Sequence, residues 1–180
     1  MSLSLAQLSQ LFAQAFAAQY RTLLVGGFSE PFYLAPKGEA WGEIRYRDDY
    51  FSSALHELAH WCLVGPGRLA QDDYGYWYQG ERDLAAQQRF EQFEARPQAL
   101  EWLLHLACGL EFRPSADNLS YPDYDLGPFS RRIEQQAKLL LERLPPRAAI
   151  LISKLDQACQ NSLWPVAQQR VQAGLSHCLC

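Results

Sequence analysis

Apolar residues recur at steps of three and four over several long stretches of the chain, the spacing of helices that bury one face. The helix expected at residues 50–62 has a wider apolar surface than the others, because its apolar residues cover most of its sides. Pro97 falls inside the longest stretch, where it is tolerated as a kink or as the start of a second helix. The pattern predicts helices at residues 5–20, 50–62, 83–108, 129–143 and 147–160.

Three short segments between the first two helices are typical of strands and are separated by glycine and proline. They cover residues 22–25, 32–34 and 43–46. The chain has 180 residues, 48% hydrophobic and 20% charged, enough for one sizeable core but not for two. We therefore expect a single compact α+β domain over residues 1–175, a small sheet packed against several helices, and a disordered tail at 176–180.

Charge and hydropathy exclude some functions. The net charge of -4 argues against broad binding to nucleic acids or anionic membranes, since both depend on a basic surface. No apolar run approaches the roughly 20 residues of a membrane span, and the first residues lack a basic secretory start. Five cysteines without a CxxC pair suit reduced thiols. These features predict a cytoplasmic protein.

The most informative motif is His56-Glu57-Leu58-Ala59-His60. Residues four apart on a helix lie one turn apart on the same face, so both imidazoles can reach one cation. Two histidines within a largely buried helix each need a partner for a ring nitrogen, and one metal ion serves both. The motif indicates a metal site, whereas several reactions are compatible with it.

A reactive metal site needs a third protein ligand and an open position. The long helix offers Glu94, which shares a face with Gln87, Gln98, Glu101 and His105. Glu91, on an adjoining face, is the alternative carboxylate. We expect the metal to lie between two helices, and we interpret His105 as a core residue or one that supports a ligand.

Three kinds of function fit these ligands. A zinc metallopeptidase would use His56, His60 and Glu94, with Glu57 as the general base for a zinc-bound water. An oxygenase would use the two histidines and one carboxylate to hold Fe(II) and leave positions for oxygen and water. A non-catalytic protein with a structural metal would need a fourth side-chain ligand such as His105.

Three blocks of sequence together resemble the bacterial elongation factor P hydroxylase family. They are His56-Glu57-Leu58-Ala59-His60-Trp61-Cys62, then Asp73-Tyr74-Gly75-Tyr76-Trp77-Tyr78, and then Phe90-Glu91 with Glu94 and Pro97-Gln98-Ala99-Leu100-Glu101-Trp102. The resemblance extends from the first helix to about Gln160, which is most of the chain.

The resemblance implies a non-haem iron monooxygenase with O2 as co-substrate, although purified protein could carry zinc. Its implied substrate is a lysine of elongation factor P already extended by a β-lysyl group. The implied metal ligands are His56, His60 and either Glu94 or Glu91. Glu57 is the candidate catalytic residue; it is not an iron ligand here, and it either orients a bound water or hydrogen-bonds to a neighbouring element. The sequence has no GxGxxG loop for a nicotinamide or flavin and no 2-oxoglutarate signature, so the electron donor is not identified.

A segment rich in aromatic and acidic residues follows the histidine motif. Carboxylates beside aromatic rings hold ammonium groups through ion pairs and cation–π contacts. A lysine that carries a β-lysyl group is dicationic, which suits such a surface. The predicted substrate-binding residues are Asp73, Tyr74, Tyr76 and Trp77.

Overall fold

The N-terminal helical stretch comprises α1 (Leu5–Phe12), a π-helical turn (Ala13–Ala17) and α2 (Ala18–Tyr20). Ser4 begins it with a capping box, in which its hydroxyl accepts from the Gln7 amide and its own amide donates to the Gln7 side chain. The structure is a computed structural model that describes residues 3–72, 82–118, 124–159 and 164–174. The helix predicted at residues 5–20 is confirmed.

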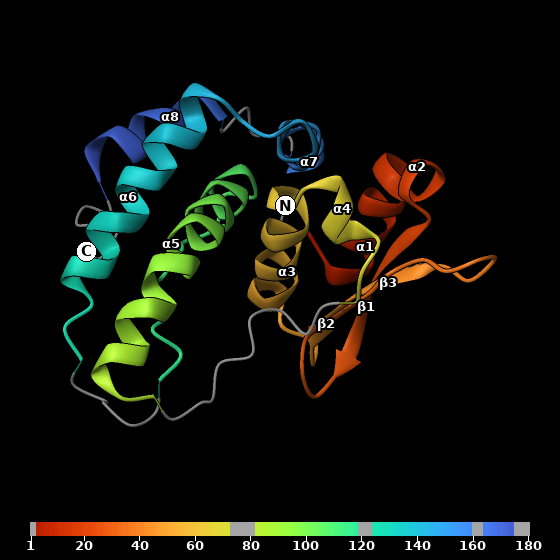
Figure 1. Cartoon of the computed structure of the whole chain (residues 1–180). Coiled ribbons are helices and arrows are strands. Elements are labelled where there is room, and N and C mark those ends of the chain that lie inside the picture. The colour runs from red at the N-terminus through yellow and green to blue at the C-terminus, as the bar shows by residue number, and fades with distance from the viewer. Residues whose placement is uncertain (1–2, 73–81, 119–123, 160–163, 175–180) are drawn as a thin grey trace.

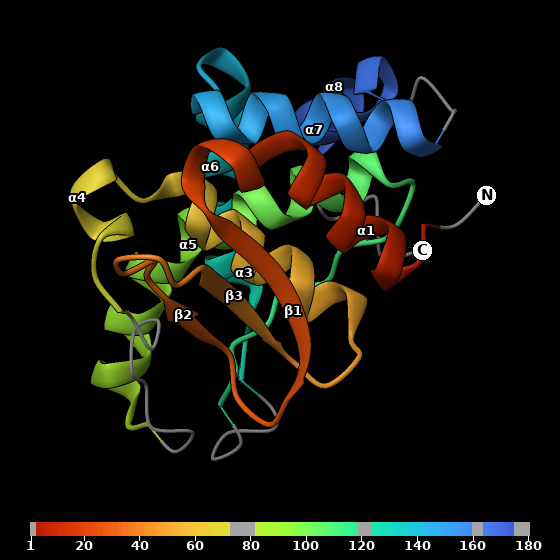
Figure 2. The ribbon, with the colours of Figure 1, turned by 90° about the vertical axis from the view of Figure 1, so that its right-hand side faces the viewer.

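A three-stranded sheet follows in the order β1-β3-β2. Its strands are β1 (Thr22–Phe28), β2 (Phe32–Leu34) and β3 (Gly42–Arg47), which confirms the three predicted segments. β3 pairs in parallel with β1 and antiparallel with β2. Alternate residues along a strand face opposite sides of the sheet, and one side buries Leu24, Ile44 and Tyr46. That side packs against helices, as Figure 2 shows.

The histidine helix α3 (Phe51–Leu63) lies between the sheet and the long helix α5 (Leu84–Ala107) (Figure 1). This position explains its broad apolar stripe, because the helix packs against a neighbour on two sides. Its buried residues are Ala54, Leu55, Leu58, Ala59, Trp61 and Cys62.

Asp83 caps the start of α5, where its carboxylate accepts from the Ala86 amide at 2.7 Å. Pro97 lies inside a single continuous helix, so it does not begin a second one. The remaining helices are α4 (Pro66–Leu69), α6 (Gly127–Glu142), α7 (Pro146–Cys159) and α8 (Trp164–Ala173). α6 and α7 confirm the two helices predicted on either side of the proline pair.

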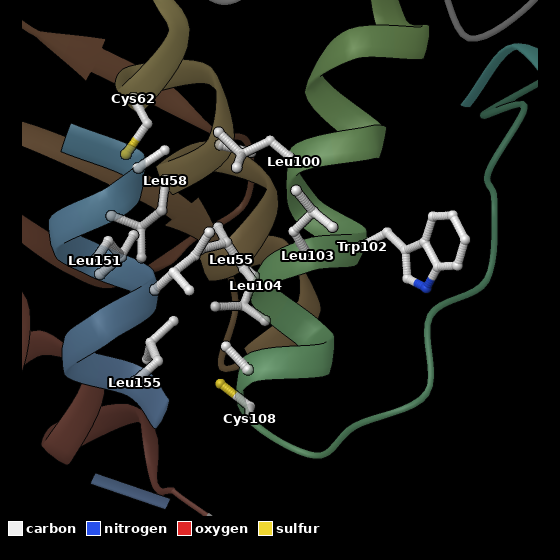
Figure 3. Close-up of a cluster of buried hydrophobic side chains, with 14 of the residues drawn as sticks. Leu55, Leu58, Cys62, Leu100, Trp102, Leu103, Leu104, Cys108, Leu151 and Leu155 are labelled. Atoms are coloured by element: carbon white, nitrogen blue, oxygen red, sulfur yellow. The ribbon is translucent and has the colours of Figure 1, made fainter. Parts of the chain in front are cut away.

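Leucines from α3, α5 and α7 form the centre of the core (Figure 3). Trp102 points away from this centre and stacks on Phe112, with ring centroids 6.3 Å apart. This contact fixes the segment that follows α5 against the helix. The core side chains labelled in the figure are Leu55, Leu58, Cys62, Leu100, Trp102, Leu103, Leu104, Cys108, Leu151 and Leu155.

Arg147 of α7 fixes the C-terminal end of α3. Its Nη2 donates to the carbonyl groups of Cys62 and Val64, and its guanidinium lies over the Trp61 ring, 4.8 Å from the centroid. A cation at a helix C-terminus satisfies free carbonyls and interacts favourably with the helix dipole. The last turn of α3, which includes His60, is therefore held in place from outside the helix.

The architecture is the predicted α+β fold, a small sheet against several helices. None of the described helices combines the length and apolar character needed to cross a bilayer. The predicted tail at residues 176–180 lies outside the described residues.

Candidate metal centre

Three side chains from α3 and α5 converge on one point. His56 and His60, one turn apart on α3, bring their Nε2 atoms to 3.0 Å from each other. Glu94 of α5 places Oε2 3.4 Å from the His60 Nε2 and 3.6 Å from the His56 Nε2. Among the described residues, these three form the group of potential metal ligands. The face of α5 that carries Glu94 lies against the histidines of α3.

The dimensions of this triangle fit one metal ion. Two ligand atoms that each lie about 2.1 Å from an ion are about 3.0 Å apart when the ligand–metal–ligand angle is about 90°. They are about 3.4 Å apart when that angle is tetrahedral. The Glu94 Oε2 is buried and has no hydrogen-bond partner among the described residues. A buried carboxylate oxygen without a partner is costly, and an ion at the centre of the triangle removes that cost.

The electrostatics of the site favour positive charge at this centre. Burial works against charge on the His56 ring, but its hydrogen bond to Glu101 and the charges of Glu101, Glu94 and Glu57 outweigh burial and raise its pKa to about 10. Burial also acts to raise the pKa of Glu94, yet the adjacent His60 and the charges of His56 and Arg82 hold that pKa below its usual value. The surroundings thus suit a cation.

The triangle opens into a cavity of about 370 Å³, within the range of small-ligand sites. Its walls come from α3, α5, the segment after α5, the end of β3 and the loop before β2. The glutamate of the motif, Glu57, faces this space, and burial raises its pKa although His56 and His60 lower it. The lining residues are Pro31, Arg47, Ser52, Ser53, His56, Glu57, His60, Phe90, Glu94, Gln98, Glu101, Arg113, Ser115 and Asp117.

Buried polar side chains hold the wall formed by the segment after α5. Gln98 pairs with Ser115 like a neighbouring strand, donating to its carbonyl at 2.8 Å and accepting from its amide at 3.0 Å. Arg82, 5% exposed, donates to the carbonyls of Ala116 and Asp117. The sequence placed Gln98 on the correct face, but nothing in it indicated that this segment folds back over the helix.

The other acidic and histidine residues of α5 that the sequence suggested for the site lie outside the ligand triangle. Glu101 lies behind His56, with Oε2 2.9 Å from the ring Nδ1. His105 donates from Nδ1 to the Glu101 carbonyl and contacts the Ser52 hydroxyl, so it lies in the core and supports the site indirectly. Glu91 is 2% exposed and its Oε2 lies 3.3 Å from Arg132 of α6, outside the triangle.

The predicted substrate-binding residues Asp73, Tyr74, Tyr76 and Trp77 lie outside the described residues. The two acids that flank this segment have structural partners. Asp72 binds Lys37 at 2.5 Å and the Ala35 amide at 2.9 Å, and Asp83 caps α5.

Comparison with known proteins places the chain in one family. Residues 11–169 match the family model described as elongation factor P hydroxylase. A curated relative from Haemophilus influenzae, named elongation factor P lysine hydroxylase, is 42% identical over 144 residues, which is 78% of this chain and 81% of the relative. The chain therefore belongs to the elongation factor P hydroxylase family.

Proposed function

We propose that this protein hydroxylates a lysine side chain of elongation factor P, with Fe(II) held by His56, His60 and Glu94. The observation that carries the proposal is the triangle of two Nε2 atoms and one buried carboxylate oxygen at a cavity, in a member of this family. Bound there, Fe(II) supplies the activation of O2 and the insertion of one oxygen atom into a C–H bond. Zinc can occupy the same ligands in purified protein.

Glu94 is the carboxylate ligand in this proposal, rather than Glu91. Glu94 belongs to the group whose ligand atoms lie within 4.8 Å of one another, whereas Glu91 is paired with Arg132. Two imidazoles and one carboxylate on one side of an ion leave positions for oxygen and water. A structural metal closed by His105 fits less well, because both nitrogens of that ring already contact other groups.

The residues of the chain have separate tasks in this reaction. The cavity walls exclude bulk water and orient the lysine arm, and Glu57 holds a proton or a water molecule beside the ion. More specifically, we propose that the substrate is the lysine already extended by a β-lysyl group. Its ammonium groups are bound by Asp73, Tyr74, Tyr76 and Trp77.

We assign the reaction to the cytoplasm. The free thiols of Cys62, Cys108 and Cys159 support this assignment. An external electron donor supplies the electrons that reduce the second oxygen atom to water.

The proposal predicts a gain of one oxygen atom on β-lysylated elongation factor P, dependent on both iron and air. The measurement is mass spectrometry of the substrate after incubation with protein loaded with Fe(II) or Zn(II), with and without oxygen. Unmodified elongation factor P and the Glu94→Gln variant are the controls. Cleaved substrate with the zinc-loaded protein would point to a peptidase instead.

Glu57→Gln separates the hydroxylase from a metallopeptidase with the same ligands. The amide keeps the shape of the side chain and leaves the three ligands in place, so we expect metal binding to remain. Hydroxylation should persist at a rate on the order of ten- to a hundredfold lower, because only proton handling is impaired. Total loss of turnover in a variant that still folds and binds metal would contradict this role.

Asp73→Asn should weaken binding of the β-lysylated substrate about tenfold or more, because a charge-assisted contact to an ammonium group is lost. Metal affinity should not change. Asp72→Asn is the matched control, since Asp72 is bound to Lys37 and Ala35. Equal losses of substrate and metal binding in Asp73→Asn would indicate a folding role.

A further inference from the structure

Glu101 lies directly behind one of the two histidines. Its Oε2 is 2.9 Å from the Nδ1 of His56, on the side of the ring opposite the triangle. Glu101 is 8% exposed and comes seven residues after Glu94, so both carboxylates project from the same face of α5. α5 therefore places Glu94 in the triangle and Glu101 against the other nitrogen of the His56 ring.

The hydrogen bond determines the tautomer of His56. An ionised carboxylate only accepts hydrogen bonds, so the proton between Glu101 and His56 belongs to Nδ1. A histidine that binds a metal ion is neutral, so the lone pair of His56 as a ligand lies on Nε2, which faces the triangle. The two histidines differ in this respect, because no described residue accepts a hydrogen bond from the Nδ1 of His60.

His105, one turn after Glu101 on α5, links the two helices beside this pair. His105 donates from Nδ1 to the Glu101 carbonyl at 2.9 Å, and its Nε2 lies 3.3 Å from the Ser52 hydroxyl of α3. The Oε1 of Glu101 lies 4.0 Å from the same His105 ring. The contact between His105 and Ser52 lies one turn from the Glu101–His56 pair on both helices, and it thus helps to fix the distance between the carboxylate and His56.

We propose that Glu101 is a positioning residue that orients His56 and strengthens it as a metal ligand through the Nδ1 hydrogen bond. A carboxylate behind a metal-bound imidazole fixes the ring and makes its free nitrogen a better donor. The inference rests on the metal site of the proposed function, and it adds that metal affinity depends on a residue that does not touch the ion. Glu101 acts through His56, to which it is hydrogen-bonded, rather than as a ligand of the ion.

Zn(II) affinity of the full-length protein, measured by competition with a chelator, tests this role. Glu101→Gln keeps the shape of the side chain but removes its charge, and we expect it to weaken Zn(II) binding by about ten- to a hundredfold. Glu91→Gln is the matched control, because it removes another buried carboxylate of α5 that is paired away from the site. That control should bind Zn(II) like the wild type, and Glu94→Gln should lose more affinity than Glu101→Gln.

Nitrogen-15 NMR of the zinc-loaded wild type gives a second readout that does not depend on a variant folding. It should show His56 protonated at Nδ1 and coordinated through Nε2. The opposite tautomer, or wild-type affinity in Glu101→Gln, overturns the positioning role. Failure of the wild type to bind Zn(II), or unchanged binding by Glu94→Gln, overturns instead the metal site on which the proposed function depends.

Discussion

Two imidazoles from α3 and a carboxylate from α5 meet only because these helices pack closely along their length. Small residues on α5 allow this approach, since Ala95 and Ala99 lie one turn apart and are both buried. The apolar core that these helices share with α7 fixes their offset (Figure 3). The sheet supports the other side of α3, and Arg147 secures its end. The geometry of the site is therefore a consequence of core packing.

The polar face of α5 is unusual for a helix at the centre of a protein. Buried polar groups destabilise a fold unless each finds a partner. Most of those on α5 have one: Gln87 bonds to Arg82, Gln98 to Ser115, Glu101 to His56 and His105 to Ser52. Glu94 Oε2 points to the histidines and has no hydrogen-bond partner among the described residues, as expected of an oxygen that binds a metal ion.

Local sequence patterns predicted the parts of the structure that depend on local spacing. The histidine pair follows from the helix period, and the shared face of α5 follows from the steps between Gln87, Glu94 and Glu101. The spacing of residues within each helix could not show which glutamate lies next to which histidine. That depends on how far α5 is shifted along α3 where the two helices pack. The position of the segment at residues 113–118 could not be predicted from local spacing, since it depends on Arg82 and Gln98, which are distant in sequence. The continuity of α5 through Pro97 likewise depends on tertiary packing.

The central claim is that His56, His60 and Glu94 hold one ion that retains open positions. Anomalous diffraction at the iron edge, from crystals grown with Fe(II) and without oxygen, tests it most directly. The account predicts one iron per chain, about 2.0–2.2 Å from both Nε2 atoms and from the Glu94 carboxylate, with its remaining ligands water. Iron bound elsewhere, or an ion whose coordination is filled entirely by side chains, would contradict the account.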